Sequence, residues 1–154
     1  MKIHCIGDSH TEVFSYDSTM FDIHHIGPYL AYNFHKGHES YDKTCKIITE
    51  LPPDAFILLS FGEIDCRCHV LKQKYEKNRD LEEIIDSITN SYIASAIELS
   101  KFSKNIMLLA PSPTSNRNGD YSFGPDFSYY GNYTERNIAT RLFVEMLKKK
   151  YNKV

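Results

Sequence analysis

No run of apolar residues in this sequence of 154 residues approaches the roughly 20 that a helix needs to cross a bilayer. Neither sign of charge is in excess, because 18 Lys and Arg stand against 20 Asp and Glu, a net charge of −2. The chain has no basic stripe of the kind that follows a phosphate backbone. We therefore expect neither a membrane nor a nucleic acid as its partner.

The first residues lack the features of an export signal. They contain neither the apolar run nor the small-residue cleavage site of a signal peptide, so we expect a cytoplasmic protein. Because cytosolic disulfides are rare, the cysteines are expected to be reduced thiols. They are Cys5, Cys45, Cys66 and Cys68.

The composition that is present is that of a folded globular protein. Hydrophobic residues make up 42% of the chain and charged residues 25%, which are close to the usual proportions. The length suits one hydrophobic core, and no internal repeat or low-complexity linker divides the sequence. We predict a single domain over residues 1–154.

Apolar, β-prone segments alternate with helical patterns along the chain. We predict strands at residues 2–6, 21–26, 55–61 and 105–110, and helices at residues 41–51, from Asp80 onward and from a cap at Thr134. The run at 55–61 shows no alternation, which is typical of a central strand covered on both faces. Strands that alternate with helices favour parallel β-α-β units. The predicted fold class is α/β, a three-layer α/β/α domain with a flavodoxin-like, mostly parallel sheet of four to five strands.

The last predicted helix suggests that the chain pairs with another segment or with a second copy of itself. Its buried stripe is expected to consist of Ile138, Leu142, Phe143, Met146 and Leu147. A fold of this kind would continue with one more strand, without which a sheet edge and an apolar strip on the helix would lack cover. We therefore expect a homodimer, or pairing with a downstream segment.

The candidate site lies at the carboxyl ends of the predicted strands, where parallel α/β sheets bind their ligands. The residues concerned are 8–10, 27–28, 62–67 and 111–115. Ser9 stands at a turn from strand to helix, where backbone N–H groups favour developing negative charge. The alternative is that Gly7-Asp8-Ser9 is only a turn, since all three residue types favour turns.

The strand before Ser9 and the turn itself read I-H-C-I-G-D-S-H-T. This block resembles that of the SGNH/GDSL hydrolases, with Ser9 at the position of the family's nucleophile. The resemblance, which extends in order over most of the chain, implies that Asp8 orients the turn. It also implies an oxyanion hole made by the N–H groups of Ser9 and Gly27. Gly62 or Arg67 would assist there.

The family's third block, glycine, any residue, asparagine and aspartate, corresponds here to Gly62-Glu63-Ile64-Asp65. Ile64 cannot donate the hydrogen bond that the asparagine supplies. The segment resembles instead a Gly-Glu-x-Asp-x-Arg variant, in which Glu63, Asp65 and Arg67 contact the substrate and the arginine supplies the missing positive group. In the alternative interpretation these three side chains form an ion-pair cluster that ties down the loop.

The general base is the missing part of the pattern. The family takes it from an Asp-x-x-His block near the carboxyl end, but no histidine follows His69 in this sequence. A serine without an adjacent base is a poor nucleophile. Either the block is lost, or it lies downstream of Val154, or another histidine replaces it. His10, next to Ser9, is the catalytic candidate that we retain.

The sequence Cys66-x-Cys68-His69 contains metal-binding residue types but lacks a second pair of ligands at ordinary spacing. We therefore predict no metal and no cofactor, and we expect one buried and one exposed thiol. The tyrosines near the carboxyl end fit either a sugar-stacking surface or anchors of the long loop. They are Tyr121, Tyr129, Tyr130 and Tyr133.

The sequence supports two functional hypotheses. In the first, the chain is a serine esterase or acyl-transfer domain that acts on an O-acylated small molecule or glycan through Ser9, weakly because its base is missing. In the second, it is a catalytically inactive SGNH-like binding or scaffold module whose Ser9 and Arg67 loops recognise a polar ligand. An Asp-x-x-His block downstream of Val154 would favour the first.

Overall fold

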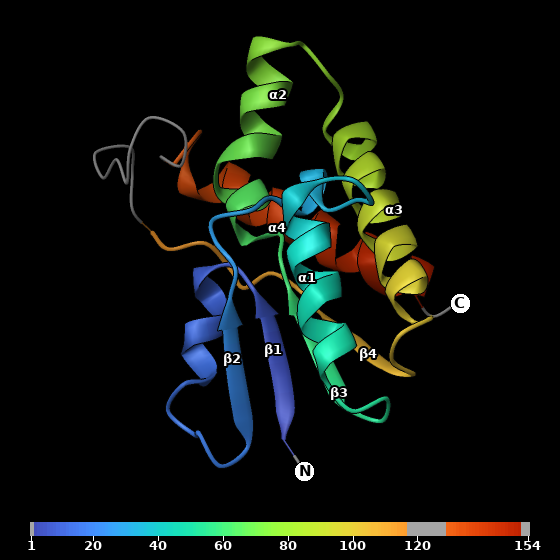
Figure 1. The fold of residues 1–154 in the computed structure, drawn as a ribbon. Helices are drawn as coiled ribbons and strands as arrows, with labels where there is room; N and C mark the ends of the chain where they lie inside the picture. The colour runs from blue at the N-terminus through green and yellow to red at the C-terminus, as the bar shows by residue number, and fades with distance from the viewer. Residues whose placement is uncertain (1, 117–128, 152–154) are drawn as a thin grey trace. The chain divides into compact units, whose positions relative to one another are not determined.

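The computed structural model describes residues 2–116 and 129–151. Its sheet consists of the strands β1 (Ile3–Gly7), β2 (Phe21–His25), β3 (Phe56–Ser60) and β4 (Asn105–Leu109), shown in Figure 1. All neighbouring strands are parallel, and their order β2-β1-β3-β4 is that of a flavodoxin-like sheet. The predicted α/β class is therefore confirmed, with four strands in the described residues.

Helical segments lie between the strands and after the last of them. They are η1 (Ser9–Phe14), η2 (Ala31–Asn33), α1 (Glu39–Glu50), the π-helical η3 (Asp65–His69), α2 (Val70–Glu76), α3 (Leu81–Leu99) and α4 (Tyr133–Tyr151). This element order is consistent with the predicted three-layer α/β/α fold. The sequence patterns predicted neither η3 nor α2.

The chain divides into two compact units. Unit 1 comprises Met1–Phe61 and Ser91–Leu109, and thus contains the sheet, η1, η2 and α1. Unit 2 comprises Gly62–Asn90 and Ala110–Val154, and thus contains η3, α2 and α4. The helix α3 begins in unit 2 and ends in unit 1. The single domain predicted from the sequence stays a prediction.

The core of unit 1 is an aromatic cluster beside β3. The rings of Phe34 and Phe61 stack with centroids 4.5 Å apart, and Tyr92 meets both edge-on at 5.9 and 6.0 Å. The buried Tyr92 hydroxyl donates a hydrogen bond of 2.9 Å to the Leu59 carbonyl. This bond ties α3 to β3, which lies between β1 and β4 and so occupies the central place predicted for it.

The buried face of α4 in unit 2 differs from the predicted stripe. Phe143 and Leu147 are buried as predicted, whereas Ile138 is 46% exposed and Leu142 and Met146 are only partly covered. The buried residues follow a helical spacing that includes polar side chains, namely Arg136, Ala139, Thr140, Phe143 and Leu147. The prediction that Ile138 is buried, which considered apolar residues alone, was therefore wrong. The homodimer, or pairing with a downstream segment, stays a prediction.

The N-cap residue of α4 also differs from the one predicted from the sequence. Asn132 Oδ1 accepts a hydrogen bond of 3.0 Å from the Glu135 N–H, and Glu135 Oε2 accepts one of 2.9 Å from the Asn132 N–H. This reciprocal pair is a capping box. Thr134, which the sequence suggested as the cap, lies inside the helix.

Replacing Asn132 should therefore destabilise the chain, whereas replacing Thr134 should not. We expect Asn132→Ala to lower the free energy of unfolding by about 1 kcal/mol, because the Glu135 N–H loses its acceptor. Thr134→Ala should change it by less than about 0.5 kcal/mol, as at other exposed positions. Urea unfolding of both variants measures the difference. An equal or larger loss for Thr134→Ala would return the cap to that residue.

Candidate functional site

The turn after β1 in unit 1 presents Ser9 at the start of η1. Asp8 caps this short helix, because its Oδ1 accepts a 2.8 Å hydrogen bond from the His10 N–H. The Asp8 carbonyl accepts a 2.8 Å bond from the Thr11 hydroxyl, and the Asp8 N–H donates a 3.2 Å bond to the Ser60 carbonyl. These contacts fix the turn at both ends while Ser9 stays exposed. The predicted placement of Ser9, between a strand and a helix, is found.

Asp8 and His10 also meet through their side chains. His10 Nδ1 lies 3.3 Å from Asp8 Oδ1, and the carboxylate is 1% exposed while the imidazole is 39% exposed. A carboxylate at Nδ1 leaves Nε2 as the nitrogen that can take up a proton, which is the division of roles in a serine–histidine–aspartate triad. Asp8 and His10, the residues on either side of Ser9 in the sequence, thus meet in a side-chain contact of 3.3 Å.

Gly27 follows β2, the strand next to β1. The N–H of Ile26 donates a 3.0 Å hydrogen bond to the Gly7 carbonyl, so the two strands stay paired up to the serine turn. Gly27 has φ +128°, a conformation that favours glycine. Among the described residues, the N–H groups of Ser9 and Gly27 donate no hydrogen bond to the protein. Both are therefore open to an added acceptor.

The surface of unit 1 is hollowed between the end of β2 and α1. The hollow has a volume of about 420 Å³ and is lined by His25, Ile26, Lys43, Lys46, Ile47 and Glu50. Ile26 stands directly before Gly27, so the hollow begins beside the proposed oxyanion position. His25 is exposed there, with Nδ1 at 3.7 Å from Glu12 Oε1 of η1.

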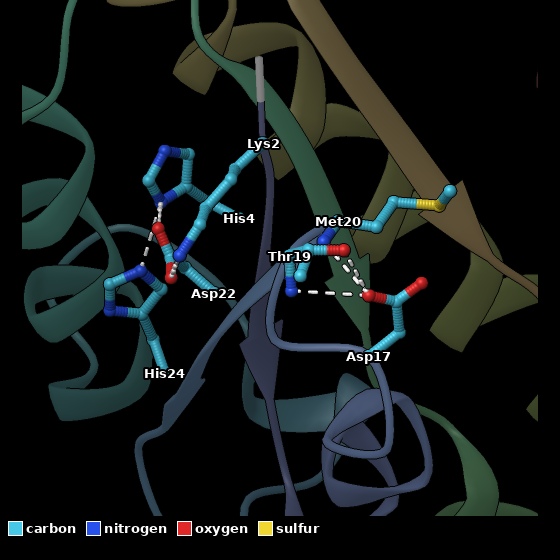
Figure 2. Close-up of polar contacts among 7 residues, drawn as sticks. All are labelled: Lys2, His4, Asp17, Thr19, Met20, Asp22 and His24. Atoms are coloured by element: carbon cyan, nitrogen blue, oxygen red, sulfur yellow. Dashed lines mark hydrogen bonds and ion pairs between the residues drawn. The ribbon is translucent and has the colours of Figure 1, made fainter.

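His4 and His24 form a separate polar cluster on β1 and β2 (Figure 2). His4 Nδ1 lies 3.2 Å from His24 Nε2, and Lys2 Nζ donates a 2.8 Å bond to Asp22 Oδ1. Burial, and next the charge on His4, lower the pKa of His24 below its usual range. The ring of His24 thus contacts a side chain of the neighbouring strand, and we interpret His24 as a structural residue.

The segment that carries the variant third block belongs to unit 2, and from Glu63 onward it is helical, not the loop expected from the sequence. Gly62 has φ +108°, and a Cβ there would lie 3.1 Å from the Phe143 ring. Glu63 Oε2 lies 3.6 Å from Arg67 Nε, and both side chains are about nine-tenths buried. Asp65 is fully buried at the start of η3. For Glu63 and Arg67 this geometry matches the interpretation of an ion pair that ties down the loop.

Arg136 joins this loop from α4, and the sequence patterns did not predict it as a site residue. The guanidinium carbons of Arg67 and Arg136 lie over the Tyr129 ring, 5.2 and 5.0 Å from its centroid. Arg136 is fully buried and donates hydrogen bonds to the carbonyls of Gly131 at 2.7 Å and Ser115 at 3.3 Å. Its helical spacing with Ala139 and Phe143 was the signal that could have revealed it.

This cluster favours one of the two interpretations of the carboxyl-terminal tyrosines. Tyr129 is held by two guanidinium groups, and the Tyr130 N–H donates a 3.0 Å bond to the Arg67 carbonyl. Both act as anchors of their segment. Tyr133 is exposed at the start of α4, and Tyr121 lies outside the described residues.

The two parts of the predicted site lie in different units. Ser9, Asp8, His10 and Gly27 belong to unit 1, whereas residues 62–67 belong to unit 2. Within the first group Asp8 contacts His10, and within the second Glu63 contacts Arg67. A single site that joins both groups stays a prediction.

Cys66, Cys68 and His69 lie close together in the sequence of unit 2. Cys66 and Cys68 are both buried, so the expected exposed thiol is absent from this pair. Burial, assisted by the charge on Asp65, raises the pKa of Cys66 well above its usual range, which keeps it an unreactive thiol. His69 is hydrogen-bonded to Gln73. Within residues 2–116 and 129–151, no group of three or more His, Cys, Asp or Glu side chains could hold a metal ion.

None of the helices in the described part of the chain is both long and apolar enough to cross a membrane. Comparisons with protein-family models, with curated proteins and with solved structures found no match to this chain. Its function must therefore be argued from the geometry of the serine turn.

Proposed function

We propose that the chain is a serine esterase or acyl-transfer domain similar to the SGNH/GDSL hydrolases, and that it acts on an O-acylated small molecule or glycan through Ser9. One observation carries the proposal. Ser9 is exposed at a strand-to-helix turn whose neighbours, the buried Asp8 and the half-exposed His10, approach to 3.3 Å. A nucleophile, a base and the group that orients the base thus occupy three successive positions.

In this proposal Ser9 Oγ attacks the acyl carbon while its proton passes to His10 Nε2. The negative charge on the former carbonyl oxygen is held by the N–H groups of Ser9 and Gly27, with Gly62 as a further donor implied by the resemblance. The bond between the acyl carbon and the alcohol oxygen then breaks, and the alcohol leaves with the proton from His10. Water, or a second alcohol, finally attacks the acyl-Ser9 ester and releases the acyl group.

Asp8 acts through His10 in this scheme. Its buried Oδ1 faces Nδ1 of the imidazole, so it orients the ring and stabilises the positive charge that forms on it. It is a positioning residue and does not take part in bond formation. Glu63, Asp65 and Arg67 would contact the substrate only in a site shared between the two units.

Hydrolysis of an activated nitrophenyl acetate tests the role of Ser9. We expect slow turnover, because the Asp-x-x-His base of the family is not found in this sequence. Ser9→Ala should lower kcat/KM by at least about tenfold, because no other group supplies the nucleophile. Ser15→Ala is the matched control, since Ser15 is an exposed serine at the end of the same short helix and should keep the full rate.

Covalent labelling gives a second readout. A fluorophosphonate should add to Ser9 of the unmodified chain, and peptide mass spectrometry locates the adduct. Ser9→Ala should remain unlabelled while Ser15→Ala is labelled normally. Turnover or labelling that survives Ser9→Ala would remove Ser9 as the nucleophile.

One observation favours the second candidate, a binding module without turnover. Ile64, at the position of the family's asparagine, is buried and apolar, so it offers no hydrogen bond to an oxyanion. The polar side chains near it are also engaged, because Glu63 and Arg67 pair with each other. A chain that binds an acylated ligand but neither hydrolyses it nor takes up the fluorophosphonate would be such a module.

A further inference from the structure

The hollow between β2 and α1 has the dimensions of a small-molecule site. Its volume of about 420 Å³ falls within the range of about 300–1,000 Å³ that is usual for such pockets. All the residues that line it belong to unit 1. The proposed reaction assigns no role to any of them.

The hollow lies at the edge of the sheet where ligands of parallel α/β folds bind. His25, the last residue of β2, pairs in register with Gly7, and the next residue, Ile26, donates its N–H to the Gly7 carbonyl at 3.0 Å. Gly7 precedes Ser9 by two residues. The lining thus includes the residue of β2 that pairs with Gly7.

The charges around the hollow favour a single negative charge on the ligand. Lys43 is already engaged, since its ammonium lies 2.8 Å from Glu39 Oε1 and 2.9 Å from the Tyr29 hydroxyl. Lys46 forms no ion pair with any described residue. Glu50 contributes one carboxylate to the same lining. The Lys46 ammonium can pair with one negative charge, whereas the Glu50 carboxylate in the same lining repels a multiply charged anion.

Ile26 and Ile47 supply the apolar part of the lining, and both are half-buried. Lysine side chains such as those of Lys43 and Lys46 also carry methylene stems that can cover apolar surface. These walls would stabilise a bound ligand by removing its apolar surface from water.

We infer that this hollow is a binding site for a small monoanion with an apolar body, such as a carboxylate or sulfonate attached to a hydrocarbon or aromatic group. Lys46 Nζ contacts the anionic group, and Ile26 and Ile47 cover the apolar body. The site is independent of catalysis by Ser9. If Ser9 acts as an esterase, the same site selects esters that carry one negative charge.

Fluorescence titration with anilinonaphthalene sulfonate, a monoanion with aromatic rings, tests the site. The neutral phenyl naphthylamine has the same rings without the charge and should bind more weakly. Lys46→Glu should weaken sulfonate binding by about tenfold or more, and Lys46→Gln by a smaller factor. Lys104→Glu is the control, because it makes the same charge change at an exposed lysine outside the lining.

Two further measurements separate this site from the proposed reaction and from unfolding. Ser9→Ala should bind the sulfonate as the unmodified chain does, whatever its effect on turnover. Amide NMR spectra should place the ligand-induced shifts at Ile26 and Ile47, and thermal unfolding should show that the Lys46 variants remain folded. Equal binding by the Lys46→Glu and Lys104→Glu variants, equal binding of the charged and neutral probes, or shifts elsewhere in the chain would overturn the inference.

Discussion

Gly7→Ala is expected to lower the free energy of unfolding by about 3 kcal/mol, at the upper end of overpacking effects. Gly7 lies opposite Ser60 in the pairing of the two central strands. A Cβ on Gly7 would lie 2.0 Å from the Ser60 carbonyl oxygen and 2.8 Å from its carbonyl carbon. Both are backbone atoms of β3, so the clash cannot be relieved by turning a side chain. The strands must separate at their carboxyl ends.

Gly37→Ala is the matched control for this change. Gly37 has φ +88°, and nothing lies within 4 Å of a Cβ placed there, so its replacement strains only the local backbone. That strain should cost about 1 kcal/mol. Urea unfolding measures both variants. A loss for Gly7→Ala no larger than that for Gly37→Ala would show that β1 and β3 tolerate a methyl group between them.

The separation of the strands should also disturb the serine turn. The Asp8 N–H donates its 3.2 Å bond to the same Ser60 carbonyl that the new methyl group would displace. Any esterase activity of Gly7→Ala should therefore fall even in the folded fraction. Glycine in the Gly-Asp-Ser segment is thus required by packing against β3, a requirement that the turn preference of the residue alone does not reveal.

Sequence patterns predicted the elements of unit 1 well, because burial on both faces of a parallel sheet leaves a direct signal. The mostly apolar run at residues 55–61, which shows no alternation, identified β3 and its central place. The helix after Asp80 was also identified correctly, since Asp80 Oδ1 accepts hydrogen bonds from the N–H groups of Glu82 and Glu83. The alternation of strands and helices predicted parallel pairing, whereas the order of the strands depends on the crossovers and could not have been read from any single segment.

The errors lie in unit 2, where several residues fit the same local role. Asn132 and Thr134 are both good N-cap residues, and only the start of the helix decides between them. Arg136 was passed over because a charged residue is rarely buried unless it is paired. Its partners include the carbonyls of Gly131 and Ser115 and the Tyr129 ring, which lie outside α4. These contacts leave no signal in the sequence, so only the helical spacing of Arg136 with Ala139 and Phe143 could have marked it.

Acidification should destabilise the chain through His69 as the pH falls from about 6.5 to about 4. Burial, and next the charges of Lys77, Lys72 and Arg79, lower the pKa of His69 from 6.5 to about 4 in the folded chain. Above pH 6.5 the imidazole is neutral in both the folded and the unfolded chain, so it adds no pH dependence. Between pH 6.5 and 4, His69 is protonated in the unfolded chain but stays neutral in the folded chain. The free energy of unfolding therefore decreases as the pH falls through this range.

The expected loss is about 2 to 3 kcal/mol at the acid end of this window, because each pKa unit corresponds to about 1.4 kcal/mol and His69 is partly exposed to solvent. His69→Gln should remove this part of the acid sensitivity, since glutamine takes up no proton. Urea unfolding of both chains at a series of pH values between 7 and 4 isolates the contribution, because the other titrating groups are common to both.

Lys77→Gln tests which cause dominates. Among the nearby charges, that of Lys77 lowers the pKa of His69 most, but burial lowers it more than any charge does. Its replacement should therefore shift the acid loss only slightly, whereas His69→Gln should abolish it. If the two variants flattened the pH dependence equally, the repulsion between charges would be the main cause. If neither changed it, His69 would carry its proton in the folded chain, and the packing of its ring beside Gln73 would have to be more open to water than the structure describes.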